Sequence, residues 1–204
     1  MQTLPPGSTI GILGGGQLGR MLSVAAAQLG YRCHIYAPDS HSVAAEVSAE
    51  FTCAKDDDIA SLTRFADACD VITFEFENVP VDPLHKIEAC APLHPPIAAL
   101  DIAQNRIAEK IFARDHGGTG APAILKTIRM GYDGKGQSRI QPGDDLDQHW
   151  EAVAHQPCVA EGFVTFDHEF SVILVRGQDG EIRFWDTPHN VHVGGILSVS
   201  TAPA

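Results

Sequence analysis

Short apolar runs alternate with segments of helical periodicity in the first part of the chain. The apolar runs predict buried strands at residues 8–13, 32–36, 51–53 and 70–75. Apolar side chains recur at helical spacing over residues 17–29, 43–50 and 59–69. Because strands that alternate with helices usually form parallel sheets, this pattern predicts a doubly wound α/β fold.

The pattern changes after a cluster of prolines at Pro92, Pro95 and Pro96. Residues 98–115 predict a helix that carries Arg106, and a glycine-rich turn follows at residues 117–120. Beyond this turn, short strands are predicted at residues 123–127, 157–161, 169–175 and 181–186. Short strands joined by tight turns are typical of antiparallel sheets, so we predict a second region of α+β class.

The chain of 204 residues is acidic, with 26 Asp and Glu against 14 Lys and Arg and a formal net charge of −12. This balance argues against nucleic acid and membrane surfaces as partners, because both are bound through basic patches. No run approaches membrane-spanning length, and the N-terminus lacks a signal-peptide pattern, so we expect a soluble cytoplasmic protein. The five cysteines show no CxxC spacing, which predicts reduced thiols.

The segment from Gly14 to Gly19 has GxGxxG spacing between a predicted strand and a predicted helix. Such a turn brings the amides of a helix N-terminus close to an anion. A NAD site also requires an acid near the end of the second strand, and Asp39 lies at about that distance but follows Pro38. The turn alone leaves open a dinucleotide site, a phosphate or sugar site, and a purely structural role.

A second glycine-rich segment follows Lys126, which lies near the end of an apolar run. Gly131, Gly134 and Gly136 make this loop permissive for close approach of backbone amides to a ligand. A strand-borne ammonium group and such a loop together suit a polyphosphate. The P-loop spacing GxxxxGK[ST] is absent, and a glycine-rich hairpin with solvated lysines is the alternative.

Several carboxylates stand on or directly after predicted strands. Glu75 and Glu77 follow a predicted parallel strand, at the edge where open α/β sheets bind their ligands. Glu161 and Glu169 belong to predicted strands of the second region. A single glutamate on a strand usually faces solvent, whereas several that follow a lysine and a glycine loop favour a nucleotide pocket.

Six segments, in this order, resemble one known family. They are GILGGGQLGRML, FEFENVP, ILKTIRMGYDGKGQ, VAEGFV, HEFSVI and HNVHVGGIL. Together they resemble the N5-carboxyaminoimidazole ribonucleotide synthetases, ATP-grasp enzymes of purine biosynthesis, from about Thr9 to the C-terminus. The resemblance implies a Rossmann-like pre-ATP-grasp domain followed by an incomplete ATP-grasp domain. It divides the chain into a substrate-binding domain, a linker helix, a lid subdomain and the start of a C-terminal subdomain, at residues 1–97, 98–117, 118–168 and 169–204.

This resemblance implies a ligase that uses ATP to join bicarbonate to the exocyclic amine of 5-aminoimidazole ribonucleotide, releasing ADP and phosphate. It implies ATP and Mg²⁺ as cofactors, small molecules as substrates and a homodimeric assembly. The γ-phosphate would activate bicarbonate as carboxyphosphate. Such chemistry needs electrostatic clamping and exclusion of water more than a side-chain nucleophile.

The resemblance also assigns roles to individual residues. Arg106, Lys126 and His192 would contact the ATP phosphates, and Glu169 would bind the ribose hydroxyls. The loop over the triphosphate would consist of Gly131, Tyr132, Asp133, Gly134, Lys135, Gly136 and Gln137. The hinge that receives adenine would consist of Glu161, Gly162, Phe163 and Val164. The ribonucleotide would meet Gln17, Leu18, Gly19 and Glu75, and the catalytic residues would be Lys126, Tyr132 and Asp133.

Two departures from the family bear on catalysis. Between the linker helix and the strand with Lys126, family members carry a strand and a helix. This chain has only residues 116–121 there. The chain also ends at Ala204, and the metal ligands of the family would lie beyond that residue. We therefore expect a fragment that is not a competent catalyst by itself. A NAD-dependent oxidoreductase and an inactive nucleotide-binding fragment are the competing functions.

Overall fold

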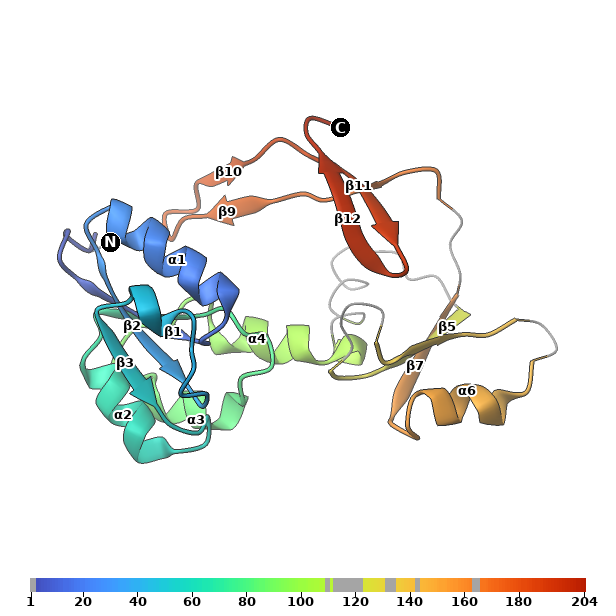
Figure 1. The fold of residues 1–204 in the computed structure, drawn as a ribbon, viewed down its shortest axis with the longest axis horizontal. Helices are drawn as coiled ribbons and strands as arrows, with labels where there is room; N and C mark the ends of the chain where they lie inside the picture. Colours follow the sequence, from blue (N-terminus) through green and yellow to red (C-terminus); the bar gives the residue numbers. More distant parts are fainter. Residues whose placement is uncertain (1–2, 109–110, 112–122, 131–134, 142–143, 163–165) are drawn as a thin grey trace. The chain divides into compact units, whose positions relative to one another are not determined.

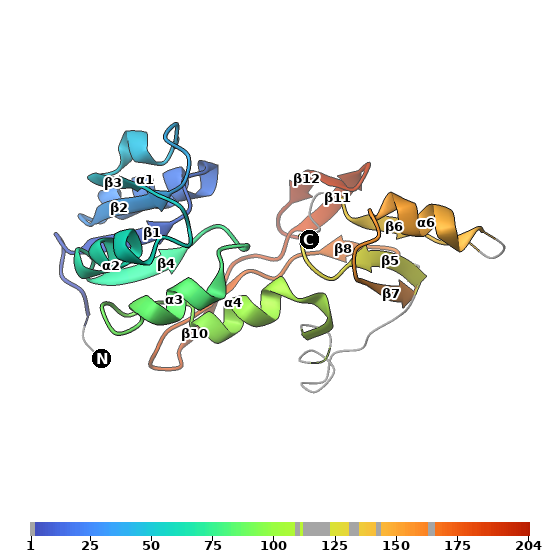
Figure 2. The ribbon, with the colours of Figure 1, turned by 90° about the horizontal axis from the view of Figure 1, so that it is seen from below.

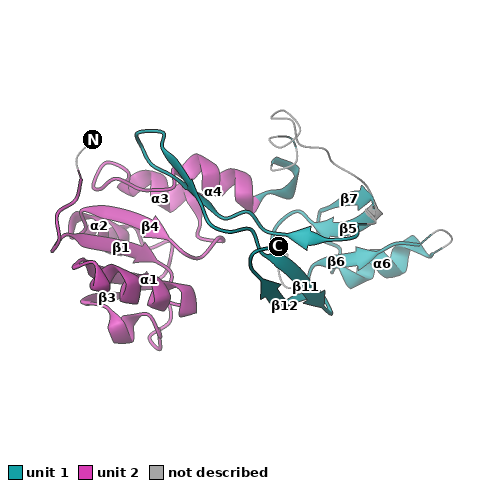
Figure 3. Ribbon diagram, turned by 90° about the horizontal axis from the view of Figure 1, so that it is seen from above, with its two compact units in different colours: residues 1, 105–204 teal, residues 2–104 magenta. Residues whose placement is uncertain are grey.

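The computed structural model describes residues 3–108, 111, 123–130, 135–141, 144–162 and 166–204. The chain divides into two compact units, residues 2–104 and residues 105–204, which are coloured separately in Figure 3. Within the described residues, no helix is both long and apolar enough to cross a membrane.

The unit of residues 2–104 contains a parallel sheet of four strands in the order β3-β2-β1-β4 (Figure 1). The strands are β1 (Thr9–Leu13), β2 (Arg32–Ala37), β3 (Glu50–Cys53) and β4 (Val71–Phe74). The helices are α1 (Gln17–Gln28), the 3₁₀ turn η1 (Ala45–Val47), α2 (Ile59–Asp67), α3 (Val81–Ile87) and α4 (Ile97–Gln104). Neighbouring strands are joined through helices, which is the parallel α/β arrangement predicted from the sequence.

Two apolar clusters cover the two faces of this sheet. Figure 2 shows the ribbon of the sheet and its helices from below. On one face, side chains from α2, α3 and α4 pack against Leu13, Tyr36 and Ile72. On the other face, Ile12 and Ile35 pack with residues of α1 and of the segment before η1. Successive strand residues point to opposite faces, so a strand covered on both sides must be apolar throughout.

The unit of residues 105–204 is built from antiparallel strands. One sheet has the order β6-β5-β7, formed by β5 (Ala123–Thr127), β6 (Gln137–Arg139) and β7 (Cys158–Gly162). Helix α6 (Leu146–Ala152) begins after Asp145, whose carboxylate accepts a hydrogen bond from the Asp147 amide. An aspartate at this position satisfies an otherwise unpaired amide of the first helical turn.

Two further antiparallel sheets form the C-terminal part of this unit. β9 (Leu174–Arg176) pairs with β10 (Ile182–Phe184), and β11 (His189–Val193) pairs with both β8 (Glu169–Phe170) and β12 (Ile196–Thr201). Side chains in these strands are largely exposed, and Asn190 is the one buried residue of the fully described segment from Glu169 to Ala204.

The two predicted fold classes are confirmed, whereas several predicted elements are wrong in extent. The helix predicted at residues 98–115 is interrupted after Gln104, because Asn105 Oδ1 accepts hydrogen bonds from the amides of Ile107 and Ala108 and so starts a new turn. The helix predicted at residues 43–50 is a 3₁₀ turn of three residues. The strand predicted at residues 169–175 is split between β8 and β9. The pattern missed α3, β6, α6, β11 and β12.

Candidate functional site

The glycine turn at the start of α1 is built around the side chain of Glu75. Glu75 follows β4, the neighbour of β1, and its amide donates to the carbonyl of Leu13. Its Oε1 accepts a hydrogen bond from the Gly16 amide at 3.0 Å. Gly14 has φ +126°, and a Cβ atom there would lie 2.5 Å from Glu75 Oε1. The turn therefore needs glycine both for its backbone angle and for the approach of this carboxylate.

A pocket of about 480 Å³ opens beside this turn. Its lining includes the turn residues 14–16 and the polar side chains of Asp39, Ser42, Asp56 and Glu75. Burial raises the pKa of Asp56, and the neighbouring Asp57 raises it further. A pocket with several carboxyl groups repels anions, so hydroxyl and N–H groups of a ligand suit it better than phosphate.

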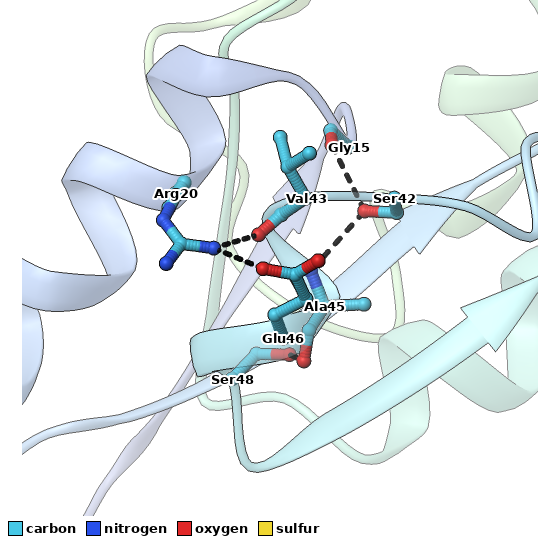
Figure 4. Close-up of polar contacts among 7 residues, drawn as sticks. All are labelled: Gly15, Arg20, Ser42, Val43, Ala45, Glu46 and Ser48. Atoms are coloured by element: carbon cyan, nitrogen blue, oxygen red, sulfur yellow. Dashed lines mark hydrogen bonds and ion pairs between the residues drawn. The ribbon is translucent and has the colours of Figure 1, made fainter.

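The loop after β2 holds the glycine turn in place, as Figure 4 shows. The Ser42 hydroxyl donates to the carbonyl of Gly15 at 2.9 Å and accepts from the amide of Ala45. The guanidinium of Arg20 donates to the carbonyl of Val43 at 2.9 Å and also pairs with Glu46. These contacts fasten one wall of the pocket through residues that the sequence did not single out.

The predicted ribonucleotide residues are only partly brought to this pocket. Glu75 lines it, whereas Gln17, Leu18 and Gly19 lie in the first turn of α1 and are absent from its lining. Gly19 is buried, and a Cβ atom there would lie 2.8 Å from the carbonyl oxygen of Gly14. The role of Gly19 that the geometry supports is close packing of α1 against the turn.

In the second unit, the side chains of Lys126 and Glu161 meet on one face of the sheet. Lys126 Nζ lies 2.9 Å from Glu161 Oε2, and the two side chains are 25% and 11% exposed. The antiparallel register sets Lys126 opposite Val159, two residues from Glu161. Side chains two apart on a strand share a face, so this pairing follows from the register.

Arg106 is fixed at the end of the strand that carries Lys126. Its amide donates to the carbonyl of Ile128 at 3.0 Å, and its guanidinium donates to the carbonyl of Thr127 at 2.8 Å. The structure thus pairs Lys126 with Glu161 and, separately, fixes the Arg106 side chain at the end of β5. The Lys126 ammonium and the Arg106 guanidinium can each hold a polyanion through charge-assisted hydrogen bonds.

The glycine loop and the hinge are described in part. Gly131, Tyr132, Asp133 and Gly134, and likewise Phe163 and Val164, lie outside the described residues. Lys135 is exposed, and Gly136 has φ +64° and accepts a hydrogen bond from the Thr127 amide. Gln137 is paired with Lys126 across β5 and β6. The ends of the loop are therefore anchored next to the lysine strand.

The side chains of Glu169 and His192 form a second close pair, at the β8-β11-β12 sheet. Glu169 Oε2 lies 3.1 Å from His192 Nδ1, and the side chains are 42% and 34% exposed. Asn190 is paired with Glu169 across β8 and β11, which places its side chain on the same face. The structure brings these predicted nucleotide contacts together with an asparagine that the sequence did not indicate.

Comparison with known proteins identifies the class that this fold and these sites define. Residues 7–104 match the model of the ribonucleotide synthetase pre-ATP-grasp domain, and residues 97–204 match the model of the ATP-grasp domain. The chain belongs to the ATP-grasp family.

Three of the similar proteins are N5-carboxyaminoimidazole ribonucleotide synthases or synthetases. An N5-carboxyaminoimidazole ribonucleotide synthase from Brucella melitensis is 43% identical over 99% of this chain and 62% of its own length. A solved ADP complex of N5-carboxyaminoimidazole ribonucleotide synthetase has a TM-score of 0.93 at 35% identity and covers 98% of this chain and 59% of its own. The Aspergillus clavatus enzyme with ADP and 5-aminoimidazole ribonucleotide has a TM-score of 0.88 at 26% identity, covering 98% and 57%.

The chain therefore spans about three fifths of the length of these relatives. The alignment with the Brucella protein extends over 224 positions, whereas this chain has 204 residues, so at least 20 positions have no residue here. This difference agrees with the short interval at residues 116–121, where family members carry a strand and a helix.

Proposed function

We propose that this chain is part of an N5-carboxyaminoimidazole ribonucleotide synthetase. The reaction is the ATP-dependent carboxylation of 5-aminoimidazole ribonucleotide with bicarbonate, which yields the N5-carbamate, ADP and phosphate in purine biosynthesis. The observation that carries the proposal is the Lys126–Glu161 pair, with Arg106 bonded to the end of β5, in a unit that matches the ATP-grasp model. The similar enzymes solved with ADP, and in one case with the ribonucleotide, support the choice of ligands.

The glycine turn supports this assignment over a NAD-dependent oxidoreductase. In a dinucleotide site, amides at the helix N-terminus receive the pyrophosphate. Here the Gly16 amide is bonded to the carboxylate of Glu75, and Asp39 and Asp56 line the same pocket. A pyrophosphate would have to displace one carboxylate and approach two others, which repel it.

In the proposed ATP site, Lys126 and Arg106 bind phosphate oxygens, and Glu161 orients the Lys126 ammonium group. Glu169 accepts hydrogen bonds from the ribose hydroxyls, and His192 lies toward the phosphates. Gly131 to Gln137 cover the triphosphate, and the segment from Glu161 to Val164 receives adenine. The support is the 2.9 Å contact between Lys126 and Glu161 and the 3.1 Å contact between Glu169 and His192.

The proposed chemistry is stepwise. An oxygen of bicarbonate attacks the γ-phosphorus of ATP, and the bond from that phosphorus to the bridging oxygen breaks, which gives carboxyphosphate and ADP. The exocyclic amine then attacks the carboxyl carbon and displaces phosphate, or carboxyphosphate first splits into CO₂ and phosphate and the amine adds to the CO₂. In both routes the proton that the amine loses passes to the released phosphate. The protein contributes by clamping charge and excluding water, because no side chain has to form a covalent bond.

The hydroxyl and amine groups of 5-aminoimidazole ribonucleotide suit the acidic pocket at Glu75. Carboxylates accept hydrogen bonds from such donors and repel phosphate. We therefore assign the sugar and the base, rather than the phosphate, to this pocket. Gln17 to Gly19 would support the turn from α1.

Magnesium is part of the proposal only as the usual companion of ATP phosphates. The described residues contain no group of three or more His, Cys, Asp or Glu side chains that could hold a metal ion. We derive no step through the ion. A cytoplasmic homodimer remains part of the proposal for the whole enzyme, and sedimentation velocity would measure the oligomeric state.

The test is release of phosphate from ATP, measured with bicarbonate in the presence and absence of 5-aminoimidazole ribonucleotide. The protein is the longest natural polypeptide that contains this sequence. The proposal predicts phosphate release that rises with the ribonucleotide and falls sharply in the Lys126→Met variant. Release that does not respond to the ribonucleotide would contradict the choice of substrate.

A further inference from the structure

Asn190 is the buried residue at the centre of the β8-β11-β12 sheet. Its side chain is 7% exposed in a segment whose other residues are all more accessible. Its Nδ2 donates a hydrogen bond to Ser171 Oγ at 2.6 Å, and its Oδ1 accepts one from Ser200 Oγ at 2.8 Å. A buried amide is stable only with its polar atoms paired, and here the partners come from two other segments.

The bridge through Asn190 joins strands that are otherwise weakly connected. β8 has two residues and pairs with β11 through Glu169 with Asn190 and Phe170 with His189, and the Ser171 amide adds one backbone hydrogen bond to the Pro188 carbonyl. Ser171 directly follows β8, whereas Ser200 lies on β12 opposite Asn190. The side chain of Asn190 therefore adds a cross-link from the central strand to both neighbours.

The same face of the sheet carries the Glu169–His192 pair of the proposed nucleotide site. Asn190 and His192 are two residues apart on β11, so their side chains share a face. Glu169 is the backbone partner of Asn190. The contact of 3.1 Å between Glu169 and His192 requires β8 to keep this register. A slip of one residue would turn Glu169 to the opposite face.

We propose that Asn190 is a positioning residue of the nucleotide site. By holding Ser171 and Ser200, it fixes β8 against β11, so that the carboxylate of Glu169 faces His192 and the ribose hydroxyls. Its importance for the ligand rests on the proposed function, whereas its effect on β8 does not.

The effect on β8 is tested without a ligand, by amide hydrogen exchange of the 204-residue chain. Asn190→Leu keeps a similar volume and removes both hydrogen bonds. We expect exchange of the β8 amides to accelerate by about tenfold, because two buried hydrogen bonds are lost and two hydroxyls lose their partner. The amides that pair β11 with β12 should change less. Val191→Ala, on the opposite face, is the control and should leave β8 unchanged.

Unchanged exchange in β8, or an equal acceleration throughout β11 and β12, would overturn the proposal. If Asn190→Leu does not fold, Ser171→Ala removes one of the two hydrogen bonds. The same selective acceleration, several-fold smaller, is then expected in β8. Its absence in this milder variant would also overturn the proposal.

The effect on the ligand is tested by comparing ATP with 2′,3′-dideoxy-ATP, which lacks the ribose hydroxyls, by isothermal titration. Asn190→Leu should weaken the binding of ATP by about tenfold. It should weaken the binding of 2′,3′-dideoxy-ATP by less than about twofold, because the residue acts through Glu169. Equal losses for the two nucleotides would overturn the positioning role. If the unsubstituted protein does not distinguish the nucleotides, the ribose role of Glu169 fails, while hydrogen exchange still decides the role of Asn190 in β8.

Discussion

Replacement of Gly14 by alanine tests the contact between the glycine turn and Glu75. Gly14 has φ +126°, a region that side-chain-bearing residues rarely adopt, and the new Cβ would lie 2.5 Å from Glu75 Oε1. Holding an alanine at this positive φ costs about 1–3 kcal/mol of backbone strain. Glu75 would have to move, and loss of its bond to the Gly16 amide adds about 1.5 kcal/mol.

Gly7→Ala is the matched control for the backbone term. Gly7 also has positive φ, at +94°, but a Cβ atom there would meet nothing within 4 Å. The free energy of unfolding of residues 2–104 can be obtained from the slowest-exchanging amides of β1 and β2. We expect Gly14→Ala to destabilise this unit by about 1.5 kcal/mol more than Gly7→Ala does.

A difference below about 0.5 kcal/mol, the usual error of additivity, would refute this reasoning. A second substitution separates the clash from the backbone strain. In a Glu75→Ala background the clash is absent, so Gly14→Ala should cost about as much as Gly7→Ala. Full additivity of Gly14→Ala and Glu75→Ala would show that the two residues do not interact.

Three further predictions follow from single side chains. Lys126→Met should weaken the binding of ATP, measured by isothermal titration, at least about tenfold, because a charge-assisted hydrogen bond is lost. Lys86→Met, on the exposed surface of α3, should leave the binding of ATP unchanged. Burial lowers the pKa of His34, so as the pH falls the unfolded state takes up a proton that the native state excludes. Urea denaturation should therefore show the free energy of unfolding of residues 2–104 falling from about pH 7 to pH 5. His34→Gln should flatten this decline. Burial raises the pKa of Cys69 to about 12, so iodoacetamide at about pH 8.5 should modify the exposed Cys53 well before Cys69, as read by mass spectrometry; equal rates would contradict this.

The parallel sheet could be predicted from the sequence because its signals are local. Each strand is a mainly apolar run. β1 and β2 carry apolar residues at consecutive positions, Ile12 with Leu13 and Ile35 with Tyr36, because both faces of the sheet are covered. α3 was missed because it has seven residues and includes Pro83 in its first turn, so it gives little periodic signal. β11 and β12 were missed because their residues are mixed polar and apolar and their pairing includes a register shift.

The candidate sites depend on contacts over long sequence separations, which the pattern does not encode. Lys126 and Glu161 are 35 positions apart, and only the register of β5 and β7 brings them together. The polyphosphate role of Lys126 was predicted from its strand and the glycine loop, whereas the place of Glu161 at the adenine hinge came from the resemblance to a family. Asp56, Ser42 and Asn190 were missed because each acts through a loop or a neighbouring strand that the sequence does not place.

The central claim is that one unit of this chain binds ATP and the other binds 5-aminoimidazole ribonucleotide. Amide hydrogen exchange of the 204-residue chain, measured with each ligand and with NADH, tests this directly. The account predicts that ATP slows exchange in β5 and β7, that the ribonucleotide slows exchange around Gly14 to Gly19 and Glu75, and that NADH slows neither. Protection of the glycine turn by NADH, without an effect of ATP on β5, would contradict it.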